Sequence, residues 1–461
     1  MGRITWISAE ASENSSNGTF WMEGKASCGV VFLLGIALLG CQRVPREPVG
    51  LQYAYSWNED RPQESALLDR FTQQTGIPVR NIVVPEASRE YVDLARKLLK
   101  AGSGPDLLNI DLIWTPILAP DLIDLQPYLA SEIERLDPQL LRSYLVNGKL
   151  VAVPFNVPIG GLEYRTDLLR KYGYTHPPRT WDELERMAER IQTGERAKGR
   201  KDFWGYVWQG NAAESLTCNA LEWQAAAGGG RIIEPDRSIS VNNPAAIRSW
   251  QRAKRWIGWI SPPGVVSYRE NDTALVFDSG RAAFSRVWIL TPMSRRGEAR
   301  HIGWRSLRFV VDTGLSRLPG DSEGSAGTLG GTGTAISSHS TRREDAIAFL
   351  RFQLRSLIDQ GENGNGAGGP TQVELSDAPP IPDPRAAGGP RKQLATFIVV
   401  RPSIETGMAY KAVSKAYSDA VHSVLMGQKS APDAAAELEK QLVSITGFRP
   451  GPPQTTDSNM R

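Results

Sequence analysis

Strand-like and helix-like segments alternate near the start of this chain, and this alternation restricts the folds that the chain can adopt. Residues 51–57, 77–84 and 107–111 are short β-type runs. Residues 62–75 and 87–101 separate them and carry apolar residues at helical spacing. A βαβαβ order predicts a mostly parallel sheet with helices on both faces. We therefore expect an α/β fold whose ligand binds at the carboxyl ends of the strands.

Polar and aromatic residues follow two of these strands at their carboxyl ends. Asn58 and Glu59 come after the first strand, whereas Asp111 and Trp114 come at the end of the third. These positions predict contact with a ligand. A helix cap or a surface ion pair is the alternative role for Glu59 and Asp111.

Charge and composition exclude several classes of protein. The 461 residues include 53 Lys plus Arg and 50 Asp plus Glu, so the net charge of +3 lacks the strong basic footprint of a nucleic-acid-binding protein. Four histidines and three cysteines leave little material for a metal site, and we expect neither a metal nor a cofactor.

The N-terminal region contains the one strongly apolar run, Cys28–Leu39. Its 12 residues are too few for a spanning helix, which needs about 20 residues, so it predicts the core of an export signal. The run ends in Leu-Leu-Gly-Cys at residues 38–41, which resembles a bacterial lipobox and implies lipidation of Cys41. A signal peptide without lipid attachment is the alternative, and Met22 is an alternative start of translation. We expect an extracytoplasmic protein anchored to a membrane.

Several local signals organise the rest of the chain. Asn147-Gly148 between two apolar runs predicts a hairpin. Thr180 with Glu183 and Thr341 with Glu344 fit capping boxes that open helices. Residues 361–389 are rich in Gly and Pro and predict a long flexible loop. Two further helices are predicted from apolar stripes at Tyr410, Val413, Tyr417 and Val421 and at Leu438, Leu442 and Ile445.

A series of short motifs, in order along the chain, points to a known family. The motifs are FTQQTGIPV (71–79), GPD (104–106), IDLIW (110–114), NGK (147–149), VPF (153–155), YRTDLL (164–169), PRTWDEL (178–184), GRAA (280–283), LGG (329–331) and RPS (401–403). By their order and spacing behind a lipobox, the chain resembles the family 1 extracellular solute-binding proteins of ATP-binding-cassette sugar importers, especially the maltose- and trehalose-binding branch.

The resemblance implies a two-lobe periplasmic-binding-protein-like fold (type II) with a sugar, such as trehalose or maltose, in a cleft between the lobes. It implies no enzymatic activity, and it implies a membrane permease as the partner of a monomeric chain. The expected division is 1–40 extension and signal, 41–50 tether, 51–157 plus 309–358 first lobe, 158–308 plus 390–447 second lobe, 361–389 loop and 448–461 flexible tail.

Sugars present apolar C–H faces and rings of hydroxyls, so their sites need aromatic plates beside carboxylates, amides and arginine. The resemblance places a stacking aromatic at Trp288, with a core tryptophan as its alternative role. Gly330 and Gly331 would let the backbone approach the sugar, or form a plain turn. The remaining candidates of this kind are Asn156, Glu214 and Arg401, with Trp208 as a secondary one.

One departure from the family pattern concerns the residue before Glu214. Relatives often carry an aromatic residue there, whereas this chain has Ala213. The shape of the pocket on that side, and so the sugar bound, is left open.

Two other classes of function are alternatives to sugar binding. A glycoside hydrolase needs two carboxylates about 5–9.5 Å apart, but Glu214 and Glu222 lie at i and i+8 of a predicted helix, about 12 Å apart. No Walker motif occurs in the sequence. A lipid-anchored structural or adhesive protein without a small ligand is the other alternative.

Overall fold

The computed structural model describes residues 50–55, 62–83, 88–100, 104–136, 141–156, 158–289, 312–362 and 398–454. The chain separates into two units, Met1–Glu47 and Pro48–Arg461, and all the described residues belong to the second. Cys41 and the export signal, Asn58, Glu59, and residues 363–389 of the Gly/Pro-rich loop lie outside the described residues.

The first sheet has five strands in the order β2-β1-β3-β12-β6. Their bounds are β1 (Leu51–Tyr55), β2 (Val79–Val83), β3 (Leu107–Asp111), β6 (Val153–Asn156) and β12 (Thr332–Ile336). β1 pairs in parallel with both β2 and β3, which confirms the predicted βαβαβ unit. β12 runs antiparallel to β3 and β6, so the sheet is mixed on that side.

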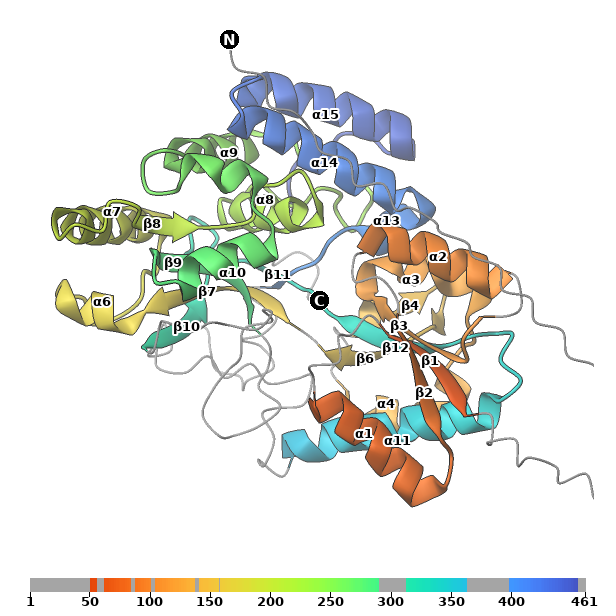
Figure 1. Cartoon of the computed structure of the whole chain (residues 1–461). Coiled ribbons are helices and arrows are strands. Elements are labelled where there is room, and N and C mark those ends of the chain that lie inside the picture. Colours follow the sequence, from red (N-terminus) through yellow and green to blue (C-terminus); the bar gives the residue numbers. More distant parts are fainter. Residues whose placement is uncertain are drawn as a thin grey trace, which may run out of the picture. The chain divides into compact units, whose positions relative to one another are not determined.

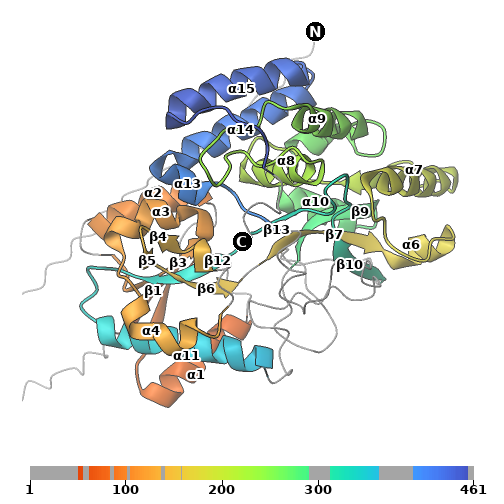
Figure 2. The same ribbon diagram turned by 180° about the vertical axis from the view of Figure 1, so that it is seen from behind.

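Helices pack against this first sheet because each presents one apolar stripe to it. They are α1 (Pro62–Thr75), α2 (Ser88–Lys100), η1 (Leu112–Trp114), α3 (Thr115–Leu118), η2 (Ala119–Asp121), α4 (Gln126–Ile133) and α11 (Arg343–Glu362). α1 and α11 lie side by side (Figures 1 and 2), and Phe71 of α1 meets Phe349 of α11 edge to face at 5.1 Å. We call this sheet with its helices the first lobe.

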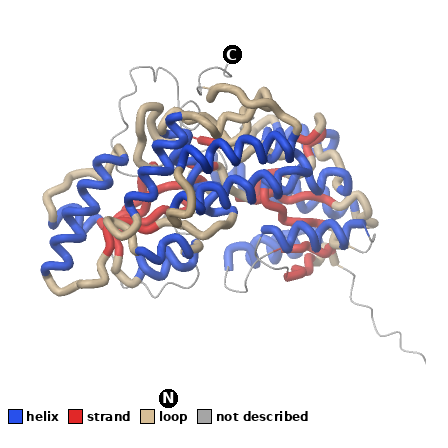
Figure 3. The backbone as a smooth tube through the Cα atoms, turned by 90° about the horizontal axis from the view of Figure 1, so that it is seen from above, coloured by secondary structure: helices blue, strands red, loops and turns tan. Residues whose placement is uncertain are grey.

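The second sheet has the strand order β10-β7-β9-β8. Its strands are β7 (Ile159–Arg165), β8 (Trp204–Val207), β9 (Ala282–Ile289) and β10 (Thr313–Arg317). The helices that accompany it are α6 (Thr166–Lys171), α7 (Trp181–Ala197), α8 (Glu214–Ala226), α9 (Pro244–Trp256), η3 (Pro263–Ser267), α10 (Glu270–Asp278), α14 (Tyr410–Leu425) and α15 (Ala431–Thr446). This sheet with its helices is the second lobe, and helices run alongside the strands of both sheets (Figure 3).

The boundary expected at residue 309 needs correction. β10 pairs with β7 of the second sheet, and Leu318 and Ala326 are buried in the core of the second lobe. The chain therefore enters the first lobe only after the short strand β11 (Gly327–Thr328), which pairs with β13 (Ile398–Val399). Residues 312–326 belong to the second lobe because β10 forms hydrogen bonds with β7. No local pattern in the sequence predicts this pairing.

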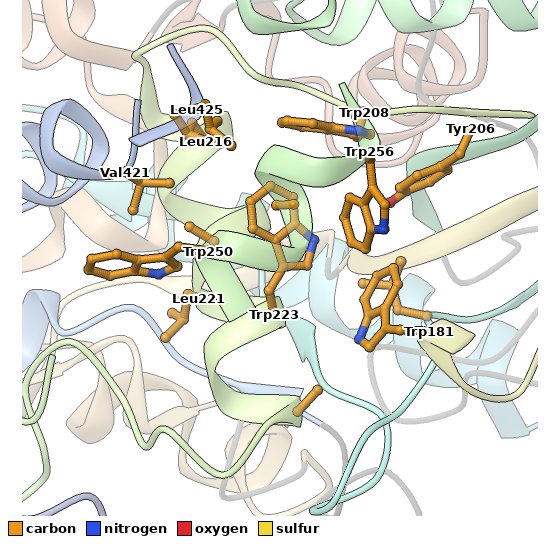
Figure 4. Packing of buried hydrophobic residues seen from close by; sticks show 14 of the residues in the cluster. Trp181, Tyr206, Trp208, Leu216, Leu221, Trp223, Trp250, Trp256, Val421 and Leu425 are labelled. Carbon is orange, nitrogen blue, oxygen red and sulfur yellow. The ribbon is translucent and has the colours of Figure 1, made fainter. Parts of the chain in front are cut away.

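An aromatic cluster fills the core of the second lobe (Figure 4). Trp208 meets Trp223 edge to face at 5.0 Å, and Trp223 meets Trp256 at 5.6 Å. The Nε1–H of Trp208 donates to Ser261, and its side chain is fully buried. Trp208 is thus a core residue, which corrects its secondary candidacy as a ligand contact.

The hairpin signal and the cap signal at Thr180 correspond to observed structure, whereas α11 begins at Arg343, one residue later than the capping box predicted at Thr341 requires. β4 (Leu145–Val146) and β5 (Lys149–Leu150) form the predicted hairpin, and both Asn147 and Gly148 have positive φ angles. The Thr180 side chain accepts from the N–H of Glu183 at the start of α7. α13 (Ser403–Thr406) and η4 (Gly407–Ala409) precede α14.

The described part of the expected C-terminal tail is paired rather than free. The N–H of Gly451 donates to the carbonyl of Ile239, and the N–H of Ile239 donates to the carbonyl of Arg449. Separately, none of the helices in the described part of the chain combines the length and apolar character needed to cross a membrane.

Candidate ligand-binding site

Arg401 is the centre of a polar cluster that joins residues from both lobes. It lies between β13 and α13, and its side chain is only 3% exposed. Nη1 donates to Oε1 of Glu214 at 3.0 Å, whereas Nη2 lies 3.5 Å from Oδ1 of Asp111. Nη2 also donates to the carbonyl of Leu329 at 3.3 Å. The structure thus brings together three of the candidates predicted from the sequence.

Asp111 ends β3 and caps the short helix η1. Its Oδ1 accepts from the N–H of Ile113 at 3.2 Å, and its side chain remains 31% exposed. Burial raises the pKa of the Asp111 carboxyl above its ordinary value, and the charge of Arg401 only partly opposes this rise. Asp111 therefore caps a helix, which was the alternative role predicted for it. It is also a partly exposed hydrogen-bond acceptor beside Arg401.

Glu214 opens α8, and both of its carboxylate oxygens accept hydrogen bonds. Oε1 accepts from Arg401 and from the hydroxyl of Tyr410, and Oε2 accepts from Oγ of Ser414 at 2.6 Å. Burial raises the pKa of Tyr410 well above its ordinary value, so its hydroxyl stays protonated and can donate. Tyr410 and Ser414 were not predicted as site residues. Their i, i+4 spacing on α14 was the signal that could have paired them.

Trp288 lies near the end of β9 and is partly exposed. Its ring lies against the backbone of Gly330, because a Cβ placed on Gly330 would come within 2.8 Å of Cζ3 of Trp288. A side chain at position 330 would therefore displace the indole. Gly330 also donates its N–H to the carbonyl of Pro158 at 2.8 Å.

Gly331 connects the same segment to the end of β3. Its φ of 126° is a conformation that residues with a side chain rarely adopt. Its carbonyl accepts from the N–H of Leu112, the residue after Asp111, at 3.1 Å. One stretch of backbone thus contacts Trp288 at Gly330 and bonds at Gly331 to the residue that follows Asp111.

Two further candidates are Trp114, which is buried, and Asn156, whose side chain is not among those described. Trp114 is fully buried in the core of the first lobe and meets the ring of Tyr410 at 6.0 Å. Direct contact between Trp114 and a ligand does not fit this position, because η1 turns the indole inward. Asn156 ends β6, where it pairs with Thr332, and its side chain lies outside the described residues.

Glu222, the second carboxylate on α8, is not part of the cluster around Arg401. It forms an ion pair with Arg286, and both side chains are fully buried. Within the described segments, no group of three or more His, Cys, Asp and Glu side chains could hold a metal ion. The cluster around Arg401 offers charged and neutral hydrogen-bonding groups close to an indole, a combination that can bind a polyhydroxylated ligand.

Comparison with known proteins gives matches over most of the chain. A family model described as bacterial extracellular solute-binding protein matches residues 57–356. A probable ABC transporter-binding protein of Deinococcus radiodurans is 36% identical over 383 residues, which is 82% of this chain and 89% of that protein.

Solved structures show the same fold. Maltose-bound MalE3 of T. maritima has a TM-score of 0.70 and 30% identity, over 86% of this chain and 99% of that one. A solute-binding protein of Thermotoga lettingae bound with alpha-D-tagatose has a TM-score of 0.67 and 21% identity, over 86% and 99% of the two chains. These likenesses confirm the predicted two-lobe α/β fold.

Proposed function

The chain belongs to the family of bacterial extracellular solute-binding proteins, and from this premise we propose that it binds a disaccharide or short oligosaccharide such as maltose or trehalose. The family implies an extracytoplasmic location, a sugar ligand and an ABC permease in the membrane as partner. In the proposed function, the sugar is held between the two lobes and delivered to that permease.

One observation carries the proposal: Arg401 joins Asp111 of the first lobe to Glu214 of the second. Charged groups of this kind hold vicinal hydroxyls, and an exposed indole face stacks on the apolar face of a sugar ring. Trp288 is next to this cluster because the two contact neighbouring residues. Arg401 donates to the carbonyl of Leu329, and Trp288 packs on Gly330. The maltose bound to MalE3, at 30% identity, supports the class of ligand.

The proposal extends to the mode of attachment. Cys41 in its lipobox-like sequence is the proposed site of lipidation, which would hold the protein at the membrane beside the permease. The proposed site residues are Asn58, Glu59, Asp111, Asn156, Glu214, Trp288, Gly330, Gly331 and Arg401.

The two competing functions fare differently. The relatives of this chain are transport proteins and not enzymes. Glu222 is bound by Arg286, so it is also unavailable as the partner carboxylate of Glu214 in hydrolysis. The remaining alternative is a structural or adhesive lipoprotein without a small ligand, and the experiment below distinguishes it from a sugar-binding protein.

Thermal melting in the presence of maltose, trehalose, sucrose and maltotriose tests the proposal. A ligand that binds only the folded state stabilises it by RT ln(1 + [L]/Kd), about 2.7 kcal/mol at a concentration near 100 Kd. We expect at least one of these sugars to raise the melting temperature and to be recovered unchanged. If the melting temperature rises with none of them, the structural alternative is favoured instead.

A further inference from the structure

Arg286 and Glu222 form a bidentate ion pair in the interior of the second lobe. Nη2 of Arg286 donates to Oε1 of Glu222 at 2.6 Å, and Nε donates to Oε2 at 3.2 Å. Neither side chain has any exposed surface. Burial alone would lower the pKa of the guanidinium, but Glu222 outweighs this and raises the pKa above its ordinary value. A buried pair of this kind is seldom needed for stability, since apolar residues of similar volume often serve as well.

Backbone from two other segments closes around the pair. Oε1 of Glu222 also accepts from the N–H of Thr328 at 3.1 Å, which ties the pair to β11. A Cβ on Gly160 of β7 would come within 1.9 Å of the same oxygen, so only glycine fits there. The pair therefore lies where β7 and β11 meet, directly before the Leu329–Gly331 segment that passes the candidate site.

The guanidinium of Arg286 also lies over the ring of Trp288. Its Cζ is 4.0 Å from the ring centroid, within the range of a cation–π contact. Residues i and i+2 of a strand point to the same face of a sheet, which places these two side chains together on β9. Arg286 covers one face of the indole, while Gly330 limits the movement of its six-membered ring.

We propose that Arg286, locked in place by Glu222, is a positioning residue that fixes the ring of Trp288 for ligand binding. The inference rests on the proposed function, because it takes Trp288 to be the stacking residue for the sugar. The Glu222 carboxylate sets the plane of the guanidinium, and that plane sets the plane of the indole. Because Thr328 bonds to the same carboxylate, Gly330 is held in register with the ring.

The test compares the wild type with Arg286→Lys and with the double variant Arg286→Met/Glu222→Gln. Lysine keeps the charge but lacks the planar guanidinium. The double variant removes both buried charges together, so no unpaired charge is left and the fold is expected to survive. Denaturant melts establish first that each variant is folded.

The first readout needs no ligand. Each protein is labelled with 5-fluorotryptophan, and the Trp288 signal is identified in the 19F NMR spectrum by its loss in Trp288→Phe. We expect the Trp288 signal to shift or broaden in both Arg286 variants, while the signal of Trp114, in the core of the first lobe, stays in place. An unmoved Trp288 signal in a folded variant would overturn the proposal.

The second readout is the affinity for maltose by titration calorimetry. A cation–π contact of ordinary strength corresponds to an affinity loss of about threefold to thirtyfold, which we expect in both variants. In a Trp288→Ala background, Arg286→Lys is expected to cause no further loss, because the ring that it positions is gone. Unchanged affinity in Arg286→Lys and in the double variant would refute a positioning role. So would a further loss of affinity when Arg286→Lys is added to Trp288→Ala.

Arg196→Lys is the matched control. The guanidinium of Arg196 lies 4.3 Å from the centroid of Trp204, so the variant removes the same kind of contact away from the site. It should move the Trp204 signal and leave both the Trp288 signal and the affinity unchanged. If the wild type binds no sugar but Trp288 still moves with Arg286, the sugar assignment fails and the positioning of the ring stands.

Discussion

Arg401 and Glu214 are joined by a hydrogen bond of 3.0 Å although 187 positions separate them in the sequence. The bond links the segment after β13 to the first turn of α8. Tyr410 and Ser414 of α14 complete the environment of the same carboxylate. This relationship places the charge of Arg401 at the first turn of α8.

Arg401→Gln is expected to weaken sugar binding by at least about thirtyfold. Removing one partner of a buried, hydrogen-bonded charge pair costs about 2–5 kcal/mol, and about 1.4 kcal/mol is tenfold in affinity. Titration calorimetry measures the loss. Arg252→Gln is the control, because Arg252 also bonds to two carboxylates, Asp182 and Asp321, on the surface of the second lobe. Equal affinities in the two variants would contradict the role of Arg401.

Trp288→Ala is expected to reduce affinity at least about thirtyfold while the free energy of unfolding changes little. A large aromatic side chain in a water-excluding site costs about 2 kcal/mol or more of binding when truncated. Trp208→Ala provides the contrast, since loss of a fully buried indole costs about 3–5 kcal/mol of stability. Calorimetry and denaturant melts on both variants separate the roles. A Trp288 variant with normal affinity and a collapsed melting midpoint would show it to be a core residue.

Glu195 should make stability depend on pH in the acid range. Burial alone would raise its pKa, but hydrogen bonds from Lys171 and Arg200 outweigh it and lower the pKa from 4.5 to about 2. The stabilisation is therefore complete above the unfolded pKa and is lost as the pH falls toward about 2. Because both cations are partly exposed, Glu195→Gln should cost about 1–2 kcal/mol at pH 7.

Chemical denaturation between pH 7 and pH 2 checks this expectation. The gap between wild type and Glu195→Gln should narrow as the pH falls. Glu437→Gln, which breaks a surface pair with Lys429, should change stability by less than about 0.5 kcal/mol. A gap that widens toward acid pH would have the wrong sign for this account.

Cys41→Ser should release the protein from the membrane. One acyl chain gives only marginal membrane binding, whereas several chains give stable anchoring, so loss of the lipidated residue removes the anchor. Cell fractionation with mass spectrometry of the mature N-terminus measures both location and lipid. Cys218→Ser is the control, because the Cys218 thiol is buried inside the fold. Membrane association that persists in Cys41→Ser, with no acyl mass on the wild type, would refute lipidation.

Local signals predicted the parts of the fold that depend on neighbouring residues. The hairpin at Asn147-Gly148 and the cap at Thr180 follow from backbone and side-chain preferences over a few residues. The parallel pairing of β1 with β2 and β3 follows from the order of elements. The insertion of β12 between β3 and β6 was not predicted, because strand pairing across long separations leaves no periodic mark in the sequence.

The site was predictable only in part, for a similar reason. Asp111 could be found from its position at the end of a strand, and Arg401 from a resemblance. Trp114 was misplaced, because an indole that follows a strand has the same pattern whether it faces the core or a ligand. The partnership of Arg286 with Glu222 joins residues 64 positions apart, so only the folded chain reveals it.

Solution scattering with and without maltose tests the central claim, that a sugar is held between two lobes and selects their closed arrangement. Maltose is added at a concentration that saturates its effect on the melting temperature, and Arg401→Gln at the same concentration serves as control. The account predicts a smaller radius of gyration for the wild type with sugar than without it, and no change for the variant. Saturating binding that leaves the wild-type scattering curve unchanged would contradict the account.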